Sequence, residues 1–207
     1  MDEIYNVPKL SKGEVHQTEL IIKKSRFITS IAHTATVEEC KEFIAKISSQ
    51  YADANHNCFA FNATKPFSSA FCGCSDDGEP HGTAGRPMLN VLLHQDVGEI
   101  TVVVTRYFGG ILLGTGGLVK AYQDSVKEGL LSLETTERMI PSYLYVTIEH
   151  RFITQFLRML EPYRASIEDQ KFLDRASYKI LLPASNLENF SNELVTLTHG
   201  SALISRE

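Results

Sequence analysis

The sequence lacks long apolar runs, and this shortage excludes some classes of protein. None of its 207 residues lies in a run of about 18 apolar residues, the length that a transmembrane helix requires. The first residues, MDEIYNVPKLSKGE, are polar and acidic, which is not typical of a secretory signal. We therefore expect a cytoplasmic protein without a membrane partner.

Cysteine is also scarce. The four cysteines are Cys40, Cys58, Cys72 and Cys74, and without an export signal we expect no disulfide framework. The pairs His56-x-Cys58 and Cys72-x-Cys74 have one intervening residue, whereas structural zinc sites prefer about two to four. The sequence therefore predicts buried free thiols, no metal and no other cofactor.

Basic residues are outnumbered, which argues against a general electrostatic attraction to nucleic acid. The chain has 20 Lys and Arg against 25 Asp and Glu, a formal net charge of −5. The imbalance lies in residues 1–137, with 12 basic and 17 acidic residues, because residues 138–207 have 8 of each. Any contact with RNA would need a local basic face.

Hydrophobic patterning predicts an α+β fold with two domains. Before residue 132 the pattern indicates strands over 14–22, 27–34, 55–63 and 99–108, an extended piece over 68–74, and helices over 36–51, 88–95 and 118–131. After Pro141 the order is β-α-β-β-α-β, the split βαβ pattern of ferredoxin-like domains. The apolar periodicity stops between them, so we expect domains at 1–137 and 138–207.

One stretch, RYFGGILLGTGGLVKAY (106–122), is rich in glycine and lies between an expected strand and an expected helix. Arg106 and Tyr107 end the strand, a place where ligand-facing residues tend to lie. We interpret this stretch as a rim that binds an extended partner or an anion, against the alternative of a tight, closely packed turn. Its glycines are Gly109, Gly110, Gly114, Gly116 and Gly117.

Neither of two well-known nucleotide motifs fits this stretch. Gly109 and Gly114 have the spacing of a P-loop, but Thr115 stands where the lysine is needed. Gly114 and Gly116 could begin a dinucleotide fingerprint, but Val119 occupies the position of the third glycine.

A second stretch, SDDGEPHGTAGRP (75–87), gathers acidic residues in an irregular loop. Asp76, Asp77 and Glu79, with His81, could form a metal or acid–base site, although the spacing is not that of an EF-hand. The alternative is a solvated acidic turn. If this loop meets the 109–117 stretch in space, Arg106 gains carboxylate neighbours.

Three basic residues lie in KKSRF (23–27), between the first two expected strands. Lys23, Lys24 and Arg26 would form the tip of a hairpin. They could contact phosphates, or they could be an ordinary solvated turn.

The motifs KKSRF, SDDGEPHGTAGRP and VVVTRYFGGILLGTGGLVKAY, in this order, resemble the IMPACT family, in particular its two-domain bacterial members of the YigZ type. The resemblance implies a ribosomal protein S5 domain 2-like fold for the N-terminal domain. For the C-terminal domain it implies a ferredoxin-like fold similar to the last domain of elongation factor G. It brings no agreed catalytic residues, and the eukaryotic relatives regulate translation by binding a protein partner.

We therefore expect a non-catalytic binding protein, a translation-associated regulator that contacts RNA, the ribosome or a translation-linked protein. The surface would combine the Lys23, Lys24 and Arg26 tip with the 106–117 rim. One alternative is an enzyme for a small phosphorylated or acyl substrate, whose cleft would be lined by Asp76, Asp77, Glu79 and Arg106. Another is a protein-interaction module that uses the same loops.

Overall fold

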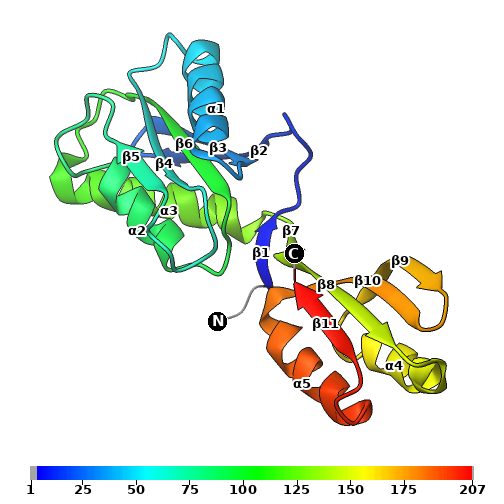
Figure 1. Ribbon diagram of the computed structural model, residues 1–207. Coiled ribbons are helices and arrows are strands. Elements are labelled where there is room, and N and C mark those ends of the chain that lie inside the picture. Colours follow the sequence, from blue (N-terminus) through cyan, green and yellow to red (C-terminus); the bar gives the residue numbers. More distant parts are fainter. Residues whose placement is uncertain (1–3, 207) are drawn as a thin grey trace. The chain divides into compact units, whose positions relative to one another are not determined.

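The N-terminal part of the chain is built on an antiparallel sheet (Figure 1). Its central strand, β6, is buried on both faces. The structure is a computed structural model and describes residues 4–206. The strand order is β2-β3-β6-β4-β5. The strands are β2 (His16–Ile22), β3 (Ser25–His33), β4 (His56–Asn62), β5 (Cys72–Ser75) and β6 (Ile100–Tyr107). β6 has the sequence ITVVVTRY, and such β-branched residues suit a strand that packs on both sides.

Helices cover both faces of this sheet. They are α1 (Val37–Gln50), α2 (Gly85–Leu93) and α3 (Gly114–Leu131). α1 packs on one face, and α2 and α3 pack on the other (Figure 1). Successive strand residues point to opposite faces, so Val103 of β6 joins the α1 core while Val102 and Val104 join the α2–α3 core.

The start of α1 follows from its sequence. The Thr36 hydroxyl accepts a hydrogen bond from the Glu39 N–H at 3.2 Å, as an N-cap should. The Glu39 carboxylate in turn accepts from the Ala35 N–H at 2.8 Å, one residue before the cap. This reciprocal arrangement satisfies backbone donors at the end of the helix.

The C-terminal part of the chain is a ferredoxin-like domain with the predicted β-α-β-β-α-β order. Its antiparallel sheet has the order β11-β8-β10-β9, and both helices pack on one face. The elements are β8 (Pro141–Ile148), α4 (Ile153–Leu160), β9 (Ser166–Phe172), β10 (Ala176–Pro183), α5 (Leu187–Leu197) and β11 (Leu203–Arg206). Short 3₁₀ turns, His150–Phe152 and Ala184–Asn186, precede the two helices. The chain is therefore α+β, with an S5 domain 2-like fold followed by a ferredoxin-like fold.

The described chain divides between Glu137 and Arg138 into two compact units, and Ile4 belongs with the second. A two-stranded sheet of β1 (Ile4–Pro8) and β7 (Thr135–Met139) was not predicted. β7 has the sequence TTERM and is almost wholly exposed. It forms by backbone pairing without burying an apolar face, so no hydrophobic alternation reveals it.

Four expected boundaries were wrong. β3 begins at Ser25 rather than at Phe27, so Arg26 lies in the strand and not in the tip of the hairpin. α3 begins at Gly114 rather than after the glycines, and α2 begins at Gly85, before Pro87. Within the piece that was expected to be extended, 68–74, the strand β5 (Cys72–Ser75) begins only at Cys72. Glycine disfavours helix interiors, so a prediction from the sequence places the start of α3 after its glycines, too late in the chain. Within the described residues, no helix combines the length and the apolar character needed to cross a membrane.

Candidate functional site

The lysine tip and the glycine-rich stretch lie against each other. Lys23 and Lys24 form the β2–β3 turn with φ values of 45° and 65°, the left-handed conformation of tight hairpin turns. A Cβ on Gly109 would lie 2.0 Å from the carbonyl carbon and oxygen of Lys24. The Gly109 N–H also donates to the Ser25 hydroxyl at 3.2 Å. Only glycine fits this approach, and it joins two motifs that are far apart in the sequence. We call residues 23–26 and 107–113 the turn–loop surface.

Exposed apolar side chains and lysines share the turn–loop surface. Phe108 is 45% exposed, Ile111 41% and Leu112 82%. Lys23 and Lys24 are exposed and have no acidic partner among residues 4–206. Large exposed apolar groups beside unpaired cations are typical of contact surfaces.

The other predicted residues of this surface are paired. The Arg26 guanidinium binds Glu19 at 2.8 Å and lies 5.9 Å from the centre of the Tyr107 ring. The Glu19 hydrogen bond holds the pKa of Arg26 above its ordinary value. The Tyr107 hydroxyl donates to Asp53 at 2.8 Å, which raises the pKa of Tyr107. Arg26 and Tyr107 therefore have local partners, unlike the two lysines.

The remaining glycines of the stretch serve different purposes. Gly110 and Gly114 have φ values of 84° and 73°, a conformation that favours glycine. Gly116 and Gly117 lie in the first turn of α3, whose start has no side-chain cap. A Cβ on Gly116 would meet nothing within 4 Å. No steric reason therefore requires glycine at Gly116.

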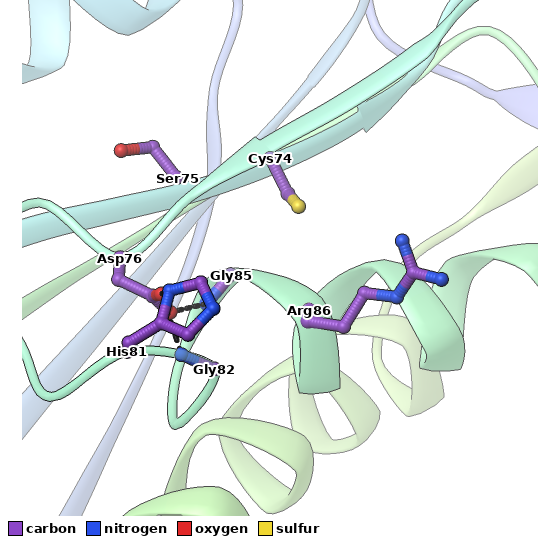
Figure 2. A pocket seen from close by; sticks show the side chains of 7 residues that line it. All are labelled: Cys74, Ser75, Asp76, His81, Gly82, Gly85 and Arg86. Atoms are coloured by element: carbon purple, nitrogen blue, oxygen red, sulfur yellow. Dashed lines mark hydrogen bonds and ion pairs between the residues drawn. The ribbon is translucent and has the colours of Figure 1, made fainter.

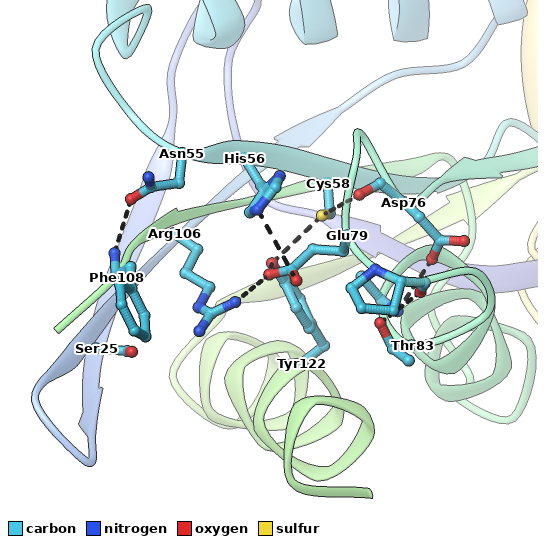
Figure 3. A network of polar contacts seen from close by, with 12 residues as sticks. Ser25, Asn55, His56, Cys58, Asp76, Glu79, Thr83, Arg106, Phe108 and Tyr122 are labelled. Atoms are coloured by element: carbon cyan, nitrogen blue, oxygen red, sulfur yellow. Dashed lines mark hydrogen bonds and ion pairs between the residues drawn. The ribbon is translucent and has the colours of Figure 1, made fainter. Parts of the chain in front are cut away.

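Beneath this surface lies a buried polar network. Phe27, Arg106 and His56 form one row across β3, β6 and β4. The Arg106 Nη1 donates to Glu79 Oε1 at 2.6 Å, and the Tyr122 hydroxyl donates to the same oxygen at 2.8 Å (Figure 3). Both members of the ion pair are buried. As expected from the two loops, Arg106 has a carboxylate neighbour, and that neighbour is Glu79.

Aromatic rings and backbone hold Arg106 in place. Its Cζ lies 5.6 Å from the ring centres of both Phe27 and Phe108, within the range of cation–π contact. The Phe108 N–H donates to Asn55 Oδ1 at 2.8 Å, and the Asn55 N–H donates to the Arg106 carbonyl at 3.1 Å. The Arg106 Nε is buried and has no hydrogen-bond partner among the described residues. Phe108 thus links the buried network to the turn–loop surface.

The Cys58 thiol belongs to the same network and is not activated. It donates to the Asp76 carbonyl at 2.9 Å and contacts the Tyr122 hydroxyl at 3.3 Å. Burial raises the pKa of Cys58 to about 12, and burial also raises the pKa of Tyr122. The thiolate is the reactive form of cysteine, so Cys58 is unsuited to act as a nucleophile at neutral pH.

Asp76 and Asp77 do not face Arg106, which corrects the expectation of a cleft lined by all four charged residues. The Asp76 carboxylate accepts from the N–H groups of Gly82 at 2.8 Å, Ala84 at 3.0 Å and Gly85 at 2.8 Å. Burial raises the pKa of Asp76, but these hydrogen bonds outweigh it and hold the pKa below its ordinary value. The Asp77 carboxylate accepts from the Asn57 N–H at 2.6 Å. Both carboxylates therefore order the loop and the start of α2.

A surface cavity of about 380 Å³ lies beside this loop (Figure 2). Burial raises the pKa of Cys74 although Arg86 opposes the change, so this thiol is not activated either. The Asp76 oxygens at its floor are already bonded to backbone. No group of three metal-ligating side chains occurs among residues 4–206. The cavity is lined by Cys74, Ser75, Asp76, His81, Gly82, Gly85 and Arg86.

Tyr122, which contacts both Glu79 and Cys58 in the buried network, could not be predicted from the sequence. Tyr122 lies on the apolar face of α3, a pattern typical of a core residue. Nothing in that pattern indicates that its hydroxyl binds Glu79. The register that aligns His56 with Arg106 was likewise hidden, because β4 and β6 are far apart in sequence. The two glycine-rich motifs were the only signal that these residues meet.

Comparison with known proteins finds two matching family models and several relatives. A family model described as the Impact N-terminal domain matches residues 23–130, and one described as a domain of unknown function (DUF1949) matches residues 146–201. IMPACT family member YigZ of Escherichia coli is 45% identical over 87% of this chain and 88% of its own. An IMPACT family member of Haemophilus influenzae is 40% identical over 97% of this chain and 95% of its own.

Two further matches extend the comparison. A solved structure titled as a hypothetical protein has a TM-score of 0.66 and 39% identity, and covers 99% of this chain and 97% of its own. Protein IMPACT of Mus musculus is 32% identical over 48% of this chain and 31% of its own. The mouse protein therefore shares one part of this chain rather than its whole length.

Proposed function

The chain belongs to the IMPACT family, and on this premise we propose that it is a non-catalytic, translation-associated binding protein that contacts ribosomal RNA through the turn–loop surface. The observation that carries the proposal is the close approach of Gly109 to Lys24. It places the two lysines, which have no acidic partner among residues 4–206, beside exposed Phe108, Ile111 and Leu112. This interaction would take place in the cytoplasm.

The chemistry of this surface suits folded RNA. Lysines at the tip of a hairpin can contact phosphates without reading sequence. Phe108 is 45% exposed, and unpaired RNA bases stack on aromatic side chains. The net charge of −5 excludes a diffuse attraction, so binding should depend on these few residues.

The interior supports a non-catalytic role. Arg106, Glu79 and Tyr122 bind one another inside the fold. The Cys58 thiol stays protonated at neutral pH, since burial raises its pKa to about 12. The family resemblance also implies that the C-terminal domain is similar to the last domain of elongation factor G, a protein that works on the ribosome. These features favour binding over catalysis on a small substrate.

Co-sedimentation with ribosomes, with and without nuclease, tests the proposal. We expect the wild-type chain to migrate with ribosomes at low salt, to dissociate as salt rises, and to lose the association after nuclease treatment. Lack of co-migration at every salt concentration would refute the proposal. Retention of a stoichiometric protein after nuclease would favour the protein-interaction alternative instead.

A further inference from the structure

The helix-free face of the C-terminal sheet carries a pair of tyrosines. In β8 (Pro141–Ile148) the side chains alternate, so Leu144 and Val146 are buried in the helix-covered core while Tyr143 and Tyr145 lie on the opposite face. Tyr145 is 38% exposed. No hydrogen bond to either hydroxyl occurs among the described residues. The two rings are therefore not part of the helix-covered core.

A lysine of the neighbouring strand lies against both rings. The Lys179 Nζ is 4.2 Å from the centre of the Tyr143 ring and 5.5 Å from that of Tyr145. Lys179 pairs with Tyr145 on one side and with Asp169 on the other in the strand register. The two central strands of the sheet thus present aromatic surface and positive charge side by side.

The next row of the same face is polar. The Thr147 and Ser177 hydroxyls are 2.9 Å apart, and Lys171 is the register partner of Ser177. A shallow hollow of about 190 Å³ lies over these rows. Two lysines against Asp169 leave the lining of this hollow net positive, in a chain with a net charge of −5. The hollow is lined by Tyr145, Val146, Thr147, Asp169, Lys171, Ser177, Tyr178 and Lys179.

We propose that this face binds single-stranded RNA, with bases stacked on Tyr145 and Tyr143 and phosphates near Lys171 and Lys179. Bases of a duplex are already stacked on each other, so exposed rings on an open sheet select unpaired bases. The Thr147–Ser177 hydroxyl pair offers donors and acceptors for a ribose 2′-hydroxyl, the group that distinguishes RNA from DNA. The face also carries Leu203 of β11, the 64% exposed register partner of Thr147, so binding of a protein instead of RNA is the alternative outcome of the test.

The sheet face would be a second contact, with single-stranded RNA as its ligand. It would bind whether or not the turn–loop surface contacts RNA. The two proposals rest on different residues, in different structural units. A chain changed at Lys23 and Lys24 should still bind a short single-stranded RNA through its sheet. The failure of one proposal can therefore be distinguished from the failure of the other.

Fluorescence anisotropy with a labelled single-stranded RNA of about ten nucleotides, a length within the range that such sites cover, tests the inference on the full chain. We expect salt-sensitive binding that the double change Tyr143→Ala and Tyr145→Ala weakens by about tenfold or more, since stacking on each ring is lost. The change Tyr145→Phe keeps the ring and should keep the affinity. The chain has no tryptophan, so quenching of tyrosine emission by the RNA gives an independent signature of stacking.

Matched controls separate stacking from general damage. Leu157→Ala removes an exposed side chain from α4 of the same unit and should leave binding unchanged. Lys171→Gln and Lys179→Gln should weaken binding and flatten its salt dependence without removing a ring. No binding by the wild-type chain, equal binding by the double tyrosine variant, or equal affinity for a fully paired RNA would each overturn the proposal.

Discussion

The buried network and the turn–loop surface contain adjacent residues of β6 and its loop, yet their chemistry differs completely. In the network, Arg106 is paired with Glu79, and Tyr122 binds the same carboxylate. On the surface, Lys23 and Lys24 have no such partner within the described part of the chain, and Leu112 is 82% exposed. The charged residues that stand out in the sequence, such as Glu79 and Arg106, therefore lie inside the fold, where they bind one another and support the surface. The contact itself is built from residues that the fold leaves unpaired.

Breaking the buried ion pair should have the largest effect. Glu79→Ala leaves the buried Arg106 guanidinium without its counter-charge, and removal of one partner of such a pair costs about 3–5 kcal/mol. Urea unfolding of the variant and the wild-type chain measures this loss. Glu79→Gln, which keeps the shape and a hydrogen-bond acceptor, is the control and should cost less. A loss below about 1 kcal/mol, the scale of an exposed pair, would show that the pair is not buried as described.

A matched pair of glycine changes sharpens the comparison at the boundary between the two regions. Gly109→Ala would place its Cβ 2.0 Å from the Lys24 carbonyl, so we expect it to destabilise the fold by roughly 2 kcal/mol through overpacking. Gly116→Ala meets nothing and should stabilise α3 by up to about 1 kcal/mol. Thermal unfolding measures both. Equal effects at the two positions would contradict the packing of the loop on the turn.

The acidic loop should show a smaller, pH-dependent effect. Asp76→Asn removes the charge that accepts three backbone hydrogen bonds, and we expect a loss of about 1.5 kcal/mol at neutral pH. The pKa of Asp76 is lowered in the folded chain, so its contribution is fully present above the ordinary value of 3.8 and is lost as pH falls through the lowered pKa.

Denaturant unfolding of both chains at neutral pH and at pH values below 3.8 checks this sign. The difference between wild type and Asp76→Asn should shrink in the acidic range. A difference that grows as the pH falls would mean that Asp76 is not held in its charged form by the loop.

The fold could be predicted from the sequence more completely than the site. Period-two alternation and the capping pair Thr36–Glu39 define their elements locally, so β8 and α1 could be predicted. β7 could not, because TTERM has no apolar face. Arg106 could be paired with the acidic loop but not with Glu79 in particular, since Asp76 and Asp77 look equivalent until backbone N–H groups occupy their carboxylates. The tyrosine pair of β8 is present in the alternation of SYLYVTIEH, but the sequence does not indicate that both helices pack on the other face of the sheet.

The salt dependence of ribosome affinity shows whether the turn–loop surface contacts RNA. We would compare the wild-type chain with the double variant Lys23→Gln and Lys24→Gln. The control is Lys12→Gln with Lys127→Gln, which removes the same charge from exposed lysines in the 9–15 segment and on α3, outside the turn–loop surface. We predict that the turn variant unfolds like wild type, binds more weakly, and has a slope of log affinity against log salt that is less negative by about 1.5. The control should match wild type. Equal affinity and slope for all three chains would contradict the assignment of the turn–loop surface as the contact with RNA.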